Sequence, residues 1–99
     1  MRKGRKIPAG FLTVIVFNRK DGNNIRRLGL ITSAKVGIAA ERNKAKRRLR
    51  EIFRTNKHKL TPGLDIIFIL KPEIKSTGYG KIKQTVLDSL KNAGFYSEQ

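Results

Sequence analysis

The sequence predicts an α+β fold in two layers, an α/β sandwich in which helices pack on one sheet. Two observations predict it. The apolar patterns follow the order strand, strand, helix, strand, helix along the 99 residues. No internal repeat, low-complexity tract or linker divides the chain, so we expect residues 1–99 to form a single domain with a modest core.

The first two apolar runs are predicted to be strands. Residues 11–17 are rich in β-branched and aromatic residues, which favour strands, and residues 27–32 form a second such run. The turn-forming pair Asp21 and Gly22 lies between the two runs. We therefore expect these strands to pair as a hairpin, although their connection is longer than a tight two-residue turn.

Residues 38–59 are predicted to form a helix with two different faces. Its apolar positions recur at spacings of three and four residues and form one stripe. They are Ala45, Leu49, Ile52 and Phe53. Most basic residues fall on the remaining arc, and Pro62 with Gly63 ends the helical pattern. We expect the helix to bury one face in the core and to turn a cationic face outward.

The last two predicted elements are a strand and a helix. Residues 64–70 are almost all apolar, which indicates a central strand, and Pro72 ends it. Ser76 or Thr77 is the expected N-cap of the last helix, and Gly94 is its expected end. The predicted buried side of this helix consists of Tyr79, Ile82, Val86 and Leu90.

Composition restricts the function to a few classes. The 23 Lys and Arg residues against 7 Asp and Glu give a net charge of +16, and a polyanionic partner relieves the self-repulsion of such a charge. The absence of cysteine excludes disulfides, thiolate metal sites and cysteine nucleophiles, and it fits a reducing compartment. The run 11–17 is too short to span a bilayer, which takes about 20 residues. We therefore expect a cytoplasmic protein.

The strongest functional signal is the density of cations in residues 42–54. This stretch carries seven Lys or Arg residues and one acid, Glu51, for a net charge of +6 over thirteen residues. Surface helices usually mix charge signs, because like charges four residues apart destabilise a helix. A solvated charged face is the alternative explanation, and the uniform sign argues against it. The pattern therefore predicts an anionic partner for this helix.

Nucleic acid is the anion that fits this helix best. Lys and Arg along one face neutralise backbone phosphates, and Arg can contact phosphate oxygens bidentately. Asn43 adds a neutral donor and acceptor for a base edge or a 2′-hydroxyl. A membrane surface is the weaker alternative, because the apolar face of the helix is needed for the core and the chain has no Trp.

The residues give little support for a catalytic site on the chain itself. The single histidine, His58, is expected to be exposed at the end of the helix. The seven carboxylates are scattered, and their spacing suggests neither a metal pair nor an acid–base pair. We therefore predict no catalytic residue and no metal ligand, and we expect a partner to supply the catalytic groups.

Residues 35–51 closely resemble a motif of the bacterial ribonuclease P protein component. That family carries a helix with the pattern Arg-Asn-Arg-x-Lys-Arg-x-x-Arg, preceded by Lys-x-Gly, and this chain reads Lys-Val-Gly and then Arg-Asn-Lys-Ala-Lys-Arg-Arg-Leu-Arg. Residues 27–30 and 60–67 also look like the family, so the resemblance covers nearly the whole chain. It implies a fold similar to domain 2 of ribosomal protein S5, with a left-handed βαβ crossover where general physics favours a right-handed one.

The resemblance also implies a function. Family members are the protein subunit of a ribonucleoprotein endonuclease that removes the 5′ leader from precursor tRNA, and a catalytic RNA performs the chemistry with Mg²⁺. The implied partners are that RNA and precursor tRNA. The RNA-binding residues implied by the motif are Lys35, Arg42, Asn43, Lys44, Lys46, Arg47 and Arg50. Leu12 and Val14 match strand positions that face the leader in relatives.

Three departures from the family pattern bear on these expectations. Lys44 replaces the second arginine of the motif and lacks its planar fork, and Ala34 stands where relatives carry a lysine. Relatives also begin with a helix that lines the leader cleft, whereas Met1 aligns near the end of that region. We expect the N-terminal helix to be lacking, truncated or lost to a misassigned start, and we expect apolar sheet surface to be exposed.

A second class of function agrees with the composition alone. It is a non-catalytic RNA-binding protein of the ribosomal or assembly type, and only the motif in residues 35–51 separates it from a ribonuclease P subunit. The sequence also leaves open whether the chain forms a dimer with a second copy of itself in the absence of RNA.

Overall fold

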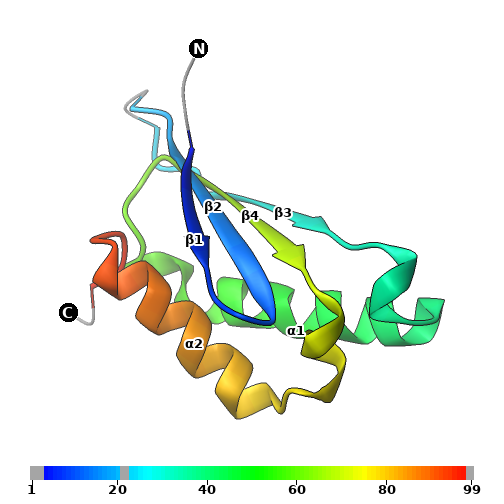
Figure 1. Cartoon of the computed structure of the whole chain (residues 1–99). Helices are drawn as coiled ribbons and strands as arrows, with labels where there is room; N and C mark the ends of the chain where they lie inside the picture. The colour runs from blue at the N-terminus through cyan, green and yellow to red at the C-terminus, as the bar shows by residue number, and fades with distance from the viewer. Residues whose placement is uncertain (1–3, 21–22, 98–99) are drawn as a thin grey trace.

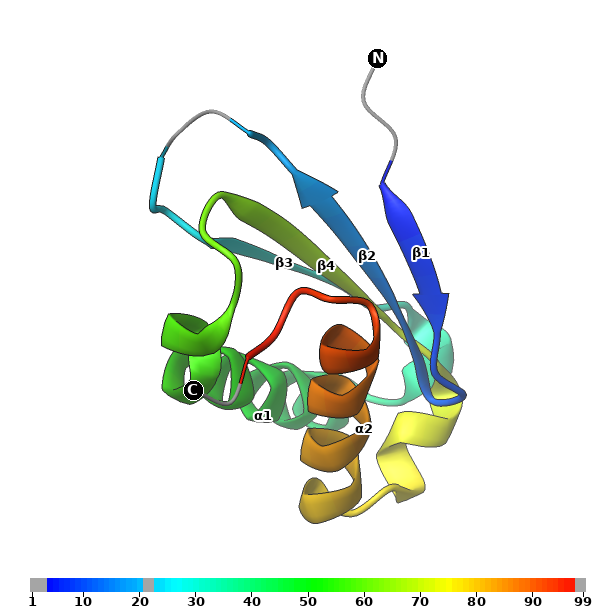
Figure 2. The same ribbon diagram turned by 90° about the vertical axis from the view of Figure 1, so that its left-hand side faces the viewer.

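The computed structural model describes residues 4–20 and 23–97. Its four strands form one sheet in the order β1-β2-β4-β3. The strands are β1 (Arg5–Pro8), β2 (Leu12–Asn18), β3 (Arg27–Ile31) and β4 (Leu64–Leu70), and the helices are α1 (Ala39–Asn56) and α2 (Tyr79–Asn92). Both helices pack against the same face of the sheet (Figure 1, Figure 2). The predicted two-layer α+β architecture is confirmed.

The predicted hairpin between residues 11–17 and 27–32 is wrong, because β4 lies between β2 and β3. β4 pairs antiparallel with β2 and parallel with β3. One face of β4 is fully buried, whereas β3 is exposed at both ends, so the more apolar strand takes the centre of the sheet. The Arg19 N–H donates to the Gly63 carbonyl (3.0 Å), which ties the end of β2 to the start of β4. Asp21 and Gly22, the predicted turn, lie outside the described residues.

The path from β3 through α1 to β4 connects two parallel neighbouring strands. In Figure 1 the chain runs along β3, returns beneath the sheet through α1 and enters β4, and Figure 2 shows β4 between β3 and β2. Together the two views give a left-handed crossover. This agrees with the expectation from the family resemblance and is the rarer hand among βαβ units.

β1 is a strand that the sequence patterns did not predict. It pairs antiparallel with β2, from Arg5 opposite Val16 to Pro8 opposite Thr13, and Gly10 with φ 82° allows the tight reversal between them. Its first two residues are cations, and it lies exposed at the edge of the sheet, where proline is tolerated. Such a strand lacks the alternation of apolar residues by which strands are recognised.

The core lies between the sheet and the two helices. Paired residues of the central strands point into it together: Leu12 with Leu70, Val14 with Phe68, and Val16 with Ile66. The helices add the buried residues Ala45, Leu49 and Ile52 of α1 and Ile82, Val86 and Leu90 of α2. Phe53 packs against this cluster, so the predicted stripe of α1 is confirmed. Tyr79 of the predicted α2 stripe is not buried, because 37% of its surface is exposed.

The helix ends differ by a few residues from the predicted ones. α1 ends at Asn56 and continues as a 3-10 helix over Lys57–Lys59. Gly78, rather than Ser76 or Thr77, is the N-cap of α2. The two hydroxyl groups instead donate to the Glu73 carbonyl (3.2 and 2.9 Å) in a 3-10 helix that precedes α2.

The N-terminus of α1 is built by three residues of the 35–51 motif. Gly37 has φ 138°, a conformation that L side chains rarely adopt. Glu41 Oε1 accepts a hydrogen bond from the Ile38 N–H (3.0 Å), and Arg42 Nη1 donates to the Gly37 carbonyl (2.7 Å). A Cβ atom at Gly37 would lie 2.2 Å from Glu41 Oε1. These residues therefore fix where the helix begins.

Asp65 holds two arginines together at one end of the helix-free face of the sheet. Its carboxylate accepts hydrogen bonds from Arg27 Nε and Nη2 (both 2.7 Å) and from Arg19 Nη1 (2.6 Å). The guanidinium groups of Arg27 and Arg19 lower the pKa of the Asp65 carboxyl to about 2. Asp65 thus compensates two cations in a chain with a large positive net charge.

The low pKa of Asp65 makes part of the stability pH-dependent. Because the folded state lowers this pKa below its unfolded value of 3.8, the stabilisation is complete above about pH 4 and is lost as pH falls toward 2. Asp65→Asn should lower the free energy of unfolding by about 1–2 kcal/mol at pH 7, since the side chain is 24% exposed and partly screened. Urea denaturation at pH 7, 4 and about 2 measures this, and the difference between the proteins should shrink at the lowest pH.

Asp88→Asn is the matched control for this substitution. Asp88 is an exposed carboxylate on α2 that accepts one hydrogen bond from Gln84 (2.9 Å). Its replacement should change the free energy of unfolding by less than about 0.5 kcal/mol. Equal losses from the two substitutions would show that Asp65 has no special role in the fold.

The geometry at Gly37 predicts that even an added methyl group destabilises the folded protein. Gly37→Ala should lower the free energy of unfolding by about 1–3 kcal/mol, because the backbone is strained and Glu41 must leave the Ile38 N–H. Thermal unfolding followed by circular dichroism measures the loss. The control is Gly80→Ala, inside the first turn of α2, where an added Cβ meets nothing within 4 Å. Similar melting temperatures for both variants would contradict the role of Gly37 in fixing the start of α1.

Candidate nucleic-acid interface

α1 turns one set of polar side chains away from the core. These side chains are Asn43, Lys46, Arg47 and Arg50, and we call them the α1 cationic face. At about 100° per residue around the helix, they lie on the arc that faces away from the buried Leu49 and Ile52. Three of them are exposed and Lys46 is partly buried. Within residues 4–20 and 23–97, none of the four side chains forms a hydrogen bond or ion pair with the protein. Their donors and charges are therefore available to an external anion.

Of the other three predicted RNA-binding residues, two lie beside this face and one lies away from it. Lys35 is exposed in the 3-10 helix Ala34–Val36, just before α1. Arg42 is partly buried, and its bond to the Gly37 carbonyl gives it a structural role as well. Lys44 lies on the opposite flank of α1, where it lines a cavity toward α2 together with Arg48. The structure thus groups four of the predicted residues and places Lys44 apart from them.

Arg54 contributes less to the interface than its place in the charge run suggests. Its Nε donates to Glu51 Oε1 (3.1 Å), and its Nη2 donates to Glu51 Oε2. These hydrogen bonds lower the pKa of Glu51 and raise that of Arg54. Of the like charges at positions 42, 46, 50 and 54, the last is therefore compensated within the helix.

The predicted leader-binding residues, Leu12 and Val14, are directed into the core. Each has 0% exposed surface, because alternate residues of β2 point toward the helices. The opposite face of the sheet is free of helices among the described residues in both views (Figure 1, Figure 2). It carries Thr13, Ile15, Phe17, Ile67, Ile69 and Ile31, the last of them 51% exposed. Thr13 is buried, and Ile15, Phe17, Ile67 and Ile69 are half-buried. The predicted exposed apolar sheet surface is therefore present in part, and it does not include Leu12 or Val14.

The described residues offer few groups for chemistry. No three His, Cys, Asp or Glu side chains in residues 4–20 and 23–97 come together as a metal site would require. His58 is exposed beyond the end of α1, as predicted. None of the helices described here has the length and apolar character to cross a membrane.

Comparison with known proteins finds the ribonuclease P family by a family model and by individual relatives. The family model described as Ribonuclease P matches residues 1–94. The ribonuclease P protein component of Clostridium kluyveri is 35% identical over 98 residues, which cover 96% of this chain and 85% of the relative. The ribonuclease P protein component of a Thermotoga species is 40% identical over 81 residues, which cover 78% of this chain and 69% of the relative.

Solved structures agree with the sequence relatives. The ribonuclease P protein of Staphylococcus aureus superposes with a TM-score of 0.82 at 31% identity, covering 95% of this chain and 84% of that protein. The ribonuclease P protein of Thermotoga maritima superposes with a TM-score of 0.78 at 32% identity, covering 90% and 83%. With this agreement of sequence and fold, the chain belongs to the ribonuclease P protein family, whose members are part of an endoribonuclease ribonucleoprotein.

Proposed function

We propose that this chain binds the catalytic RNA of ribonuclease P through the α1 cationic face. The observation that carries the proposal is that these side chains have no partner within the described protein. Lys46, Arg47 and Arg50 can neutralise phosphates and release condensed counterions, and Asn43 can contact a base edge or a 2′-hydroxyl. Lys35 and the remaining donors of Arg42 extend the contact toward the start of the helix.

The way α1 is held supports this role. Leu49 and Ile52 are buried under the sheet, and Gly37, Glu41 and Arg42 fix the first turn. The side chains of the face therefore project from a rigid element, which lowers the ordering cost of binding. A helix of 18 residues is about 27 Å long, so contacts can be spread over several phosphates.

We assign the chemistry to the RNA rather than to this chain. Mg²⁺, bound mainly by the RNA, would activate the attacking water and stabilise developing charge in the removal of the 5′ leader. The role of the chain is then electrostatic. By neutralising phosphates where the RNA and precursor tRNA meet, it lets them approach at a lower Mg²⁺ concentration.

For the leader of precursor tRNA we propose the helix-free face of the sheet. Unpaired nucleotides can pack on aromatic and apolar side chains next to cations. Ile15 and Phe17 of β2 and Ile67 and Ile69 of β4 supply the apolar surface. Arg27, which is 64% exposed beside Asp65, supplies a cation at one end of this face.

The proposed contact predicts a change in salt dependence. Arg47→Ala and Arg50→Ala should each weaken binding to a bacterial ribonuclease P RNA and reduce the slope of log affinity against log salt by about one unit. Filter binding at several salt concentrations measures both quantities. Lys83→Ala, which removes an exposed cation from α2, is the control and should leave the slope unchanged. If affinity and slope survive both arginine substitutions, α1 is not in the interface.

Reconstitution with a bacterial ribonuclease P RNA tests the enzymatic role. At low Mg²⁺ the chain should raise the rate of precursor-tRNA cleavage, because it replaces part of the counterion screening. The complex should also bind precursor tRNA more tightly than mature tRNA, which lacks the leader. RNA binding without any rise in cleavage would favour the alternative, a non-catalytic RNA-binding protein of the ribosomal or assembly type.

A further inference from the structure

A groove between α1 and the start of α2 contains side chains that the α1 cationic face does not use. It consists of two cavities that share Arg48, and we call it the α1–α2 groove. One has a volume of about 110 Å³ and is lined by Glu41, Lys44, Ala45, Arg48, Ile74, Lys75 and Ile82. The other, of about 300 Å³, is lined by Arg47, Arg48, Glu51 and Tyr79.

Tyr79 is the unusual residue of this groove. Its spacing with Ile82 and Val86 predicts a buried ring, yet it is the one aromatic among the large apolar side chains that are exposed in the described residues. It is the first residue of α2, between Gly78 and Gly80, and the space around both glycines is open. The ring is therefore accessible to a flat ligand.

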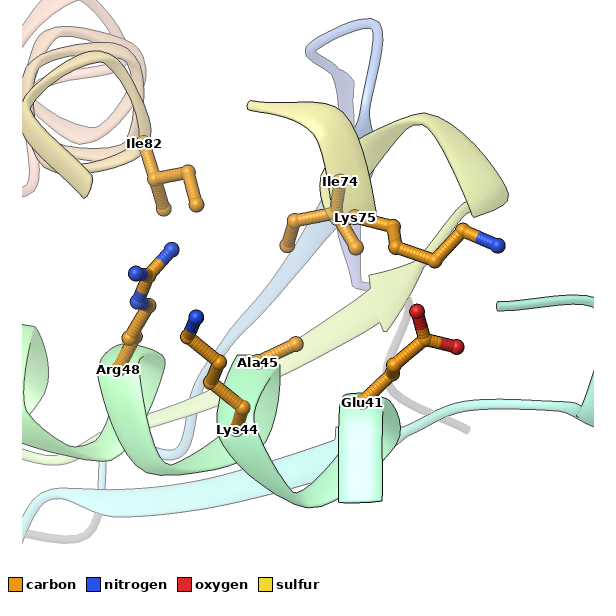
Figure 3. A pocket seen from close by; sticks show the side chains of 7 residues that line it. All are labelled: Glu41, Lys44, Ala45, Arg48, Ile74, Lys75 and Ile82. Carbon is orange, nitrogen blue, oxygen red and sulfur yellow. The ribbon is translucent and has the colours of Figure 1, made fainter. Parts of the chain in front are cut away.

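Both cavities of the groove have cations in their lining. In Figure 3, Lys44 and Arg48 extend from α1 toward Ile82, and Lys75 lies on the opposite wall. Among the described residues these three side chains have no hydrogen-bonding or ionic partner. The two acids of the groove are already engaged, Glu41 by the Ile38 N–H and Glu51 by Arg54. The groove therefore offers positive charge to a ligand.

The lining also restricts the shape of the ligand. Ala45, Ile74 and Ile82 form an apolar wall in the smaller cavity, which suits the ribose of a nucleotide, and Lys44 and Arg48 of the same lining can contact its phosphates. The larger cavity exceeds the roughly 150 Å³ in which a protein can hold a benzene ring. The bases of a duplex are stacked on each other, so only an unpaired base can reach the face of Tyr79.

We propose that the α1–α2 groove binds an unpaired nucleotide of the RNA partner, with its base on Tyr79 and its phosphates near Arg48 and Lys44. The proposal rests on the RNA binding proposed above and adds a second contact that recognises single-stranded RNA. Arg47 lies at the junction, since it belongs to the α1 cationic face and also lines the cavity beside Tyr79. A continuous RNA strand can therefore follow α1 from one contact to the other.

Tyrosine fluorescence can detect this stacking directly. The chain has two tyrosines and no tryptophan, and the second tyrosine, Tyr96, is buried and donates to Asn56 Oδ1 (3.4 Å). In a Tyr96→Phe background, Tyr79 is the sole emitter. A single-stranded oligoadenylate should quench its emission by stacking, whereas a short RNA duplex should bind without quenching it. Equal quenching by both probes, or by neither, would overturn the proposal.

Affinity measurements separate this proposal from the one on which it rests. Tyr79→Ala should weaken oligoadenylate binding about 5- to 10-fold and leave duplex binding unchanged, whereas Tyr79→Phe keeps the ring and the affinity. Arg50→Ala should weaken binding of both probes. If Tyr79→Ala has no effect while Arg50→Ala weakens both, the groove is not a site and the proposed function stands. If Arg50→Ala has no effect on either probe, the proposed function fails.

Discussion

The structure depends on the burial of one helix stripe beneath the sheet. Ala45, Leu49 and Ile52 anchor α1, and Leu49 and Ile52 are at most 1% exposed. Burial of a side chain of this size stabilises the fold by about 1.5–3 kcal/mol, whereas a like-charge pair one turn apart costs about 0.2–0.5 kcal/mol. Packing therefore outweighs the repulsion along the helix. The fold itself holds the cations of α1 in place.

The 35–51 motif combines this structural task with the RNA-binding role proposed for it. Gly37, Glu41 and Arg42 bond to one another or to neighbouring backbone and fix the helix start. Arg47 and Arg50, a few residues later, have no partner in the described protein. The motif that indicates RNA binding therefore contains two groups of residues. One group positions the helix, and the other faces outward.

Apolar periodicity was sufficient to predict β2, β4, α1 and the inner side of α2, because these elements bury continuous stripes or runs. It could not give the strand order, which depends on pairing between distant segments, or the edge strand β1, in which Arg5 and Lys6 hide the pattern. It also could not orient β2. Residues 11–17 are apolar on both faces, so no alternation shows that Leu12 and Val14 point inward. Tyr79 was wrongly predicted to be buried, because the apolar stripe of α2 is buried only where another part of the fold covers it, and the first residue of the helix is not covered.

The position of Lys44 shows which side of α1 is affected where the sequence departs from the family motif. Lys44 departs from the arginine of the motif that the sequence resembles, and it lies beside α2 rather than on the α1 cationic face. The loss of a planar fork there leaves Lys46, Arg47 and Arg50 unchanged. In the α1–α2 groove, lysine still supplies a point charge on a flexible stem, which is sufficient for a single phosphate. Under the proposed RNA-binding role, lysine at this position removes a bidentate contact in the groove, whereas the α1 cationic face keeps its charge.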